Sequence, residues 1–195
     1  VVECKAATES VGESFGTAVL VDDAGTFVTN AHVVTYKRLG ETYPFDTFFV
    51  RFSTEDEYRA AELVKYSVEK DIAVLRLKEI NGVRLRSVKI GNSQKLQAGE
   101  TVYAVGNSQN YGISIAKGMV GIPLINIRYE ERERAVIQCD ITIAEGNSGG
   151  ALLDSKGRLI GITTFRTKDH AGNVVYGIAY CIPWHIAEAY IKGEE

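Results

Sequence analysis

The chain has 195 residues, 45% of them hydrophobic, so it can bury a core either as one domain or as two small barrels that share a cleft. Its 22 basic and 25 acidic residues give a net charge of −3, which provides no positive field for nucleic acid. No apolar run approaches the roughly 20 residues of a membrane helix. The chain begins at Val1, so a signal peptide or membrane anchor removed from its start stays an open expectation.

The three cysteines, Cys4, Cys139 and Cys181, show no Cys-x-x-Cys spacing, so the sequence indicates neither a disulfide framework nor a zinc site. Cys139 and Cys181 lie in apolar, strand-like runs, where a free cysteine behaves as a small buried hydrophobic residue. We therefore expect reduced thiols, and the sequence leaves one disulfide bridge open.

Short apolar or alternating segments recur between turn signals along the chain, a rhythm typical of an all-β protein. The expected strands, in chain order, are 17–21, 26–30, 48–52, 72–77, 101–105, 113–122, 135–139, 159–165 and 174–182. Three connections end in a glycine suited to the positive φ of a hairpin turn, namely 22–25, 154–157 and 169–172. After the last strand, Pro183 opens a predicted helix over 184–191 with one apolar face.

About a dozen strands would divide into two halves between residues 85 and 100. We expect one domain over 1–195, composed of an N-terminal β-barrel over 1–90, a C-terminal β-barrel over 91–182 and a terminal helix over 183–195. A ligand site would then lie in the groove between the halves.

The segment 146–150, Gly-Asn-Ser-Gly-Gly, places a serine where it can become a nucleophile. Gly-Asn-Ser also occurs at 91–93 and 106–108, so the tripeptide alone indicates only a turn. The third copy differs because a glycine pair follows Ser148. Attack on a carbonyl creates an oxyanion, and the N–H groups of Gly146 and Ser148 can stabilise it if Gly146 adopts a conformation denied to larger residues.

A serine hydroxyl needs a base within hydrogen-bond reach, and that base needs a partner that fixes its tautomer. His170 lies in a glycine-containing turn, and His185 lies in the first turn of the expected helix. His32 follows a β run, and Asp71 precedes a predicted strand. Either residue alone is more often an ordinary surface or core group. In the order His32, Asp71, Ser148 they predict a catalytic triad.

These motifs resemble those of the trypsin-fold serine peptidases, and more closely those of the HtrA/Deg family of ATP-independent proteases. The matching segments, in the family's order, are 29–34, 71–75, 104–107, 118–120, residue 140, 146–152 and 157–162. The resemblance implies two six-stranded antiparallel β-barrels with a C-terminal helix and the triad in the cleft between them. It also implies peptide-bond hydrolysis through an acyl-enzyme, with no cofactor and no metal.

The same resemblance implies which residues bind substrate. Thr164 would support the triad carboxylate, and 164–166 would be the edge strand to which an extended substrate adds. Residues 142–143 and 177–181 would line the pocket for the residue before the cut bond. The expected substrate-binding residues are Thr142, Ile143, Thr164, Phe165 and Arg166. None is acidic, so small or medium apolar residues are favoured over Lys or Arg, and Arg166 shifts that preference or narrows the entrance.

The sequence also departs from the family's pattern. An additional stretch at 36–45 lengthens the span between His32 and Asp71. The charged segment 129–134 stands where the family places a regulatory loop, and we expect a solvated hairpin tip there. Many relatives continue beyond the terminal helix into a peptide-binding PDZ domain, and no PDZ domain is present in this sequence. A homo-oligomer, most commonly a trimer, is expected from the resemblance alone.

The sequence therefore predicts a serine endopeptidase that acts on unfolded or extended protein segments, in quality control or regulated proteolysis. Two alternatives stay open: a peptide-binding, chaperone-like module that does not cut, and a protease that is latent until its oxyanion loop is remodelled. Its expected partners are protein or peptide substrates, not nucleic acid. The resemblance favours a periplasmic, envelope-anchored or secreted location, whereas unpaired cysteines equally suit a reducing compartment.

Overall fold

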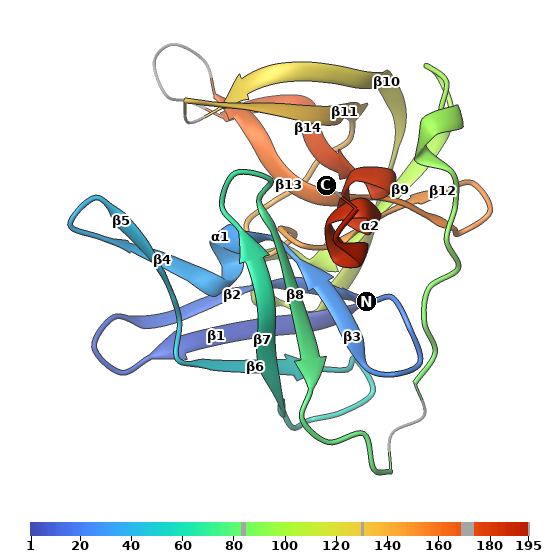
Figure 1. Cartoon of the computed structure of the whole chain (residues 1–195). Helices are drawn as coiled ribbons and strands as arrows, with labels where there is room; N and C mark the ends of the chain where they lie inside the picture. The colour runs from blue at the N-terminus through green and yellow to red at the C-terminus, as the bar shows by residue number, and fades with distance from the viewer. Residues whose placement is uncertain (83–84, 130, 169–173, 195) are drawn as a thin grey trace.

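The computed structural model describes residues 1–82, 85–129, 131–168 and 174–194. Two closed β-barrels of six strands each make up most of the chain, and the terminal helix packs beside both of them (Figure 1). Within the described residues, all pairings between neighbouring barrel strands are antiparallel, and the expected all-β fold is confirmed. The turn expected at 169–172, with His170, lies outside the described residues.

The first barrel has the strand order β1-β2-β3-β8-β7-β6. Its strands are β1 (Val2–Thr8), β2 (Gly12–Leu20), β3 (Thr26–Thr29), β6 (Thr47–Arg51), β7 (Arg59–Ser67) and β8 (Ile72–Leu77). The second barrel has the order β10-β11-β14-β13-β12-β9. Its strands are β9 (Thr101–Asn107), β10 (Ile113–Tyr129), β11 (Arg132–Asp140), β12 (Ala151–Asp154), β13 (Leu159–Lys168) and β14 (Val174–Pro183).

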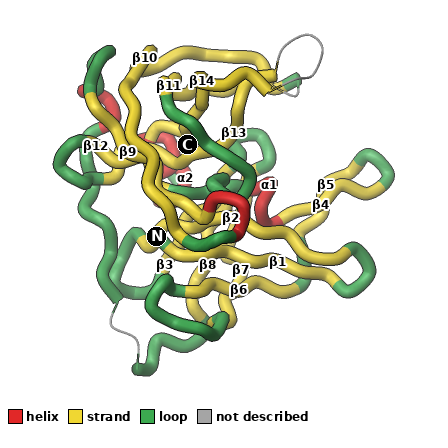
Figure 2. The backbone as a smooth tube through the Cα atoms, turned by 180° about the vertical axis from the view of Figure 1, so that it is seen from behind, coloured by secondary structure: helices red, strands yellow, loops and turns green. Residues whose placement is uncertain are grey.

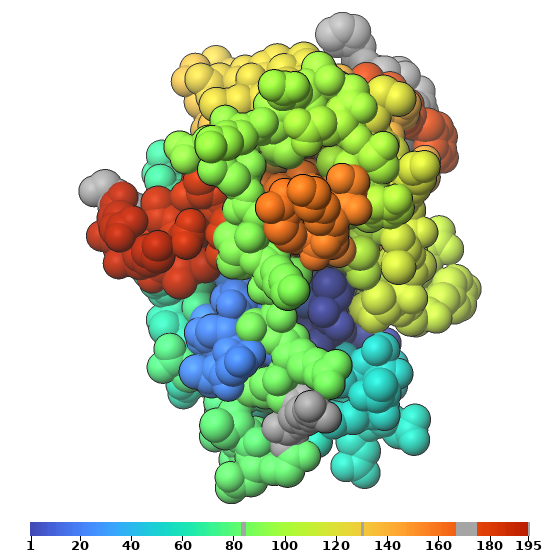
Figure 3. Space-filling model, turned by 90° about the vertical axis from the view of Figure 1, so that its right-hand side faces the viewer, coloured from blue at the N-terminus to red at the C-terminus, as the bar shows by residue number. Residues whose placement is uncertain are grey.

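The additional stretch at 36–45 forms most of a separate hairpin of β4 (Thr35–Arg38) and β5 (Glu41–Pro44), which projects from the first barrel in Figure 1. The connection between the barrels passes over one face of the molecule, where its green atoms join the two halves in Figure 3. Seen from behind, β2 and β9 lie against each other where the barrels meet (Figure 2). The two barrels therefore share a continuous junction.

An apolar cluster at this junction holds the barrels together. Val28 and Ile72 come from the first barrel, Ile162 comes from the second, and Trp184 comes from the helix α2 (Trp184–Lys192). Full burial of each large apolar side chain stabilises the fold by about 1.5–3 kcal/mol. The relative placement of the barrels, which a site between them requires, is thus fixed by packing.

The helix α2 confirms the helix expected after Pro183 and runs one residue further than 184–191. Gly193 ends it in the left-handed conformation, with φ of 73°. Lys65 Nζ donates to the carbonyl of Ile191 (3.1 Å), which links the end of the helix to β7. No helix among the described residues has both the length and the apolar character needed to cross a membrane.

The three cysteines are free and buried, which confirms the expected thiols. Burial raises the pKa of the Cys4 thiol to about 12, so this thiol stays protonated at neutral pH. All three cysteines therefore belong to the apolar cores of the barrels.

Candidate active site

His32 lies on α1 (Ala31–Val34), a single helical turn between β3 and β4. Val33 and Val34 are buried in the core of the first barrel and anchor the turn. The hydroxyl of Thr35 donates to the carbonyl of Ala31 (2.8 Å) and closes the turn. The His32 side chain, 49% exposed, therefore projects from a rigid base.

Asp71 holds the imidazole of His32 in place. Its carboxylate accepts the backbone N–H of His32 (3.0 Å) and lies 2.9 Å from Nδ1 of the ring. Asp71 itself has a φ of 55°, and its carbonyl accepts a hydrogen bond from Asn30 Nδ2 (3.0 Å). The proton on Nδ1 is directed to the carboxylate, which fixes the tautomer of the ring.

The Asp71 carboxylate is 4% exposed, yet it is held ionised. Burial by itself raises the pKa of this carboxyl, but the charge of His32 and the hydrogen bonds from His32 and Thr164 outweigh burial and hold the pKa below its ordinary value. Thr164 Oγ1 donates to Oδ2 at 2.6 Å. The expected support of the carboxylate by Thr164 is therefore present in the geometry.

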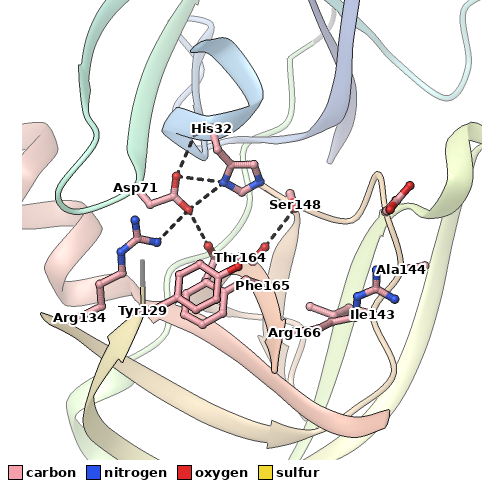
Figure 4. Close-up of a pocket in the computed structure, with 11 residues that line it drawn as sticks. His32, Asp71, Tyr129, Arg134, Ile143, Ala144, Ser148, Thr164, Phe165 and Arg166 are labelled. Carbon is pink, nitrogen blue, oxygen red and sulfur yellow. Dashed lines mark hydrogen bonds and ion pairs between the residues drawn. The ribbon is translucent and has the colours of Figure 1, made fainter. Parts of the chain in front are cut away.

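Ser148 lies on the other side of the imidazole from Asp71 (Figure 4). His32, Asp71 and Ser148 all line one cavity of about 300 Å³ between the barrels. The Ser148 hydroxyl donates to the carbonyl of Thr164 (3.0 Å). A hydroxyl has one hydrogen to donate, so donation to His32 requires this hydrogen to turn away from the Thr164 carbonyl.

The backbone before Ser148 is oriented by bonds to two other segments. The N–H of Gln109 donates to the carbonyl of Glu145 (2.6 Å), and the Thr17 hydroxyl donates to the carbonyl of Gly146 (2.6 Å). In a planar trans peptide the N–H points opposite to the C=O. The N–H of Gly146 therefore points away from Gln109. Within the described residues, neither this N–H nor that of Ser148 donates to another protein group.

Gly146 allows this arrangement because its φ is 89° and because a Cβ there would collide with the carbonyl of Asn107. We expect Gly146→Ala to rotate the peptide and lower kcat about 10²–10³-fold, the loss typical of removing one oxyanion donor. Gly157→Ala is the matched control, since Gly157 has a φ of 73° but open space around its Cβ. Peptidase kinetics on both variants test this, and equal kcat values for the two would contradict it.

Four of the five expected substrate-binding residues, Ile143, Thr164, Phe165 and Arg166, line the cavity. Thr142 does not: it is exposed, whereas Ile141 and Ile143 on either side are buried, because neighbouring residues of an extended chain face opposite ways. The segment 177–181 is also absent from the described lining. Ala179 and Cys181 within it are buried in the core of the second barrel instead.

Of the residues expected to line the pocket before the cut bond, the described lining of the triad cavity thus contains Ile143 but not Thr142 or the segment 177–181.

Two residues that were expected on a solvated hairpin tip lie inside the site. The ring of Tyr129 stacks on Phe165, with centroids 3.8 Å apart, and the Arg134 side chain is 8% exposed beside Asp71. Both line the cavity with the triad (Figure 4). The charged composition of 129–134 indicated an exposed tip, and nothing in the local sequence indicates that β11 turns one of its arginines inward.

Comparison with known proteins agrees with this architecture. The family profile described as Trypsin-like peptidase domain matches residues 16–162. A probable periplasmic serine endoprotease DegP-like of Pseudomonas putida is 33% identical over 178 residues, which cover 90% of this chain and 34% of that protein. The serine endoprotease DegS of Haemophilus influenzae is 28% identical over 180 residues, covering 92% of this chain and 49% of that protein.

Among solved structures, the HtrA-type protease AlgW with tripeptide superposes with a TM-score of 0.80 at 28% identity, over 98% of this chain and 58% of that chain. The chain thus spans between a third and a half of the length of the curated relatives named here. Its fold and profile define a trypsin-like peptidase domain. Within that class, the chain belongs to the HtrA family of trypsin-fold serine proteases.

Proposed function

We propose that this chain is a serine endopeptidase that cleaves unfolded or extended protein segments through an acyl-enzyme. The observation that carries the proposal is the approach of His32 Nδ1 to a buried Asp71 carboxylate (2.9 Å) in the cavity that Ser148 also lines. A base with a fixed tautomer beside a serine is the arrangement that nucleophilic catalysis requires.

In the first step, Ser148 Oγ attacks the peptide carbonyl while Nε2 of His32 accepts the hydroxyl proton. The imidazolium then gives that proton to the leaving amine, and the acyl group stays on Ser148. Water hydrolyses the ester in a second step, with His32 again accepting and returning a proton. Asp71 stays ionised throughout and stabilises the imidazolium. No cofactor or metal takes part in these steps.

The N–H groups of Gly146 and Ser148 serve as the oxyanion hole in this proposal. Two bonds support it: the Gln109 N–H fixes the Glu145 carbonyl, and the Thr17 hydroxyl fixes the Gly146 carbonyl. Donors held in place before the reaction stabilise developing charge without reorganising. In this proposal the oxyanion loop is oriented before substrate binds, in contrast to the alternative of a protease that is latent until the loop is remodelled.

The substrate is proposed to add as a strand beside β13. Phe165 and Arg166 pair with β14 on one side, whereas the described pairing with β12 ends at Ile162. The open edge offers backbone groups to an extended chain. Ile143 supplies an apolar wall, and Arg166 narrows the entrance, so small or medium apolar residues are favoured before the cut bond. AlgW, which has the same fold, was solved with a tripeptide, which supports a peptide ligand for this chain.

The cellular role follows from the relatives and is proposed on that basis. DegP-like relatives are described as periplasmic, which favours an extracytoplasmic location for this chain. Quality control or regulated proteolysis in that compartment is the process in which cleavage of unfolded segments is useful. A homo-oligomer, such as a trimer, is proposed by family resemblance.

A fluorophosphonate probe tests the nucleophile directly. We expect the intact protein to gain one adduct, located at Ser148 by peptide mass spectrometry, because only an activated serine reacts with the probe at neutral pH. Ser148→Ala should gain none. Ser108→Ala is the matched control, since Ser108 follows the same Gly-Asn pair and should leave labelling unchanged.

Absence of an adduct on the folded wild-type protein, together with no cleavage of a denatured protein mixture, would refute the proposal. Unchanged affinity for unfolded peptides in the variant that carries both His32→Ala and Ser148→Ala, without cleavage by the wild type, would favour the chaperone-like alternative. Cleavage fragments from the same mixture would report the preference imposed by Ile143 and Arg166.

A further inference from the structure

Arg134 makes a direct ionic contact with the carboxylate of the triad. Its Nη1 lies 3.6 Å from Oδ2 of Asp71, and its side chain is 8% exposed. The same Oδ2 atom lies 2.9 Å from His32 Nδ1 and accepts the hydroxyl hydrogen of Thr164 at 2.6 Å. The carboxylate thus has a fixed positive charge as well as the imidazole beside it.

The guanidinium is held where it stands by its surroundings. Its central carbon lies 5.7 Å from the ring centroids of both Tyr129 and Phe165. Nη2 donates to the carbonyl of Val68 (3.4 Å), next to the turn that carries Asp71. Nε is buried and has no hydrogen-bond partner among the described residues. A buried cation with so few hydrogen bonds is stable only because a carboxylate faces it.

This contact has an electrostatic consequence for the base. The Asp71 carboxylate favours the charged form of His32, and a second cation on the same carboxylate opposes that form. Arginine stays charged at every pH at which an enzyme works. Arg134 and Asp71 are both buried, so salt screens their charges little. The effect of Arg134 on the protonation of His32 therefore persists at physiological ionic strength.

We propose that Arg134 is a positioning residue that acts through Asp71 and sets the lower pH limit at which His32 serves as the general base. The inference rests on the proposed function, because it assigns Arg134 a part in the same triad. Without the guanidinium, His32 would take up its proton at higher pH, and activity would be lost earlier on acidification.

Other charged groups also face this region. Lys37 of β4 and Arg132 of β11 line a second cavity with His32, Asp71 and Arg134. Glu69, Lys70 and Glu133 line a third with Arg134. Glu145 and Arg166 line the active-site cavity. All of these groups are unchanged in an Arg134 variant. A comparison with the wild type therefore isolates the effect of the Arg134 charge, which acts beside Asp71.

The test compares Arg134→Met, which keeps the apolar stem, with Arg134→Lys, which keeps the charge. In the kcat/KM profile against pH, we expect Arg134→Met to move the acidic limb upward by about 0.5–1 pH unit, and Arg134→Lys to return most of the shift. Arg128→Met is the matched control, since Arg128 is an exposed cation of the same hairpin and should leave the limb in place.

A second readout needs no catalysis. The imidazole signals of His32 in an NMR titration should show a midpoint displaced upward in Arg134→Met by the same amount. If wild type neither cleaves nor labels with the probe, the proposed function fails, while the NMR shift still decides the electrostatic claim. Arg134→Met could instead lower stability or kcat while the midpoints of the kcat/KM profile and of the His32 titration stay unmoved. That result would make Arg134 merely structural and overturn the inference. Arg134→Gln replaces the Met variant if the latter does not fold.

Discussion

Ser148→Ala should lower kcat for a peptide substrate by about 10⁶-fold, and His32→Ala should lower it by a similar factor. The two residues act as one unit, because the hydroxyl attacks only when the imidazole removes its proton. The doubly substituted protein should therefore be no slower than either single variant. Steady-state kinetics on all three, with the background rate of hydrolysis subtracted, measure this.

His185 provides the control for this series. It also lies against a serine, with its Nδ1 2.8 Å from Ser93 Oγ, but Ser93 is buried and accepts the backbone N–H of His185 (3.0 Å). That pair joins α2 to the turn at Ser93, and among the described residues no carboxylate hydrogen-bonds to the His185 ring. We expect His185→Ala to keep kcat within about twofold. If the loss of kcat in the double variant of His32 and Ser148 equals the product of the two single losses, the two residues do not act as one unit.

The motifs around the site could be read from the sequence because each is short and chemically demanding. Ser148 follows a glycine that needs positive φ, and Asp71 directly precedes the strand β8. Nine of the twelve barrel strands were predicted from alternating apolar patterns, and the resemblance implied the two six-stranded barrels. β1, β7 and the short β12 were not predicted. Charged residues interrupt the apolar positions of β1 and β7, as with Glu3, which is buried and pairs with Arg51 at 2.7 Å.

The remaining parts of the site depend on contacts between distant segments. Gln109 reaches Glu145 from the connection between β9 and β10, and Arg134 reaches Asp71 from the other barrel. Neither has a local pattern that distinguishes it from a surface residue. A charged segment such as 129–134 is usually solvated. Stacking on Phe165 favours the interior position of Tyr129, and the Asp71 carboxylate favours that of Arg134. Tertiary structure decided these positions, and residue type did not.

Asp71→Asn should lower kcat by about 10⁴-fold at neutral pH while the fold is kept, because an amide NH₂ facing Nδ1 favours the tautomer whose proton lies on Nε2. That tautomer cannot accept the proton of Ser148. Peptidase kinetics and circular dichroism check the two halves of the prediction. Thr164→Val removes one hydrogen bond to the same carboxylate and leaves its charge, so its loss of kcat should be far smaller.

Asp71→Asn should also change how the unfolding free energy depends on pH. The sign of this change follows from the lowered pKa of Asp71. The native carboxylate binds a proton less readily than the unfolded one, so its contribution to the unfolding free energy is present above the ordinary value of about 3.9. It is lost as pH falls through the lowered native pKa. Asp71→Asn lacks this contribution, and its unfolding free energy should decline less steeply below about pH 4. Denaturant titrations at several acidic pH values measure the unfolding free energy of the wild type and of Asp71→Asn. If the two free energies decline in parallel, Asp71 is not held ionised by the native fold.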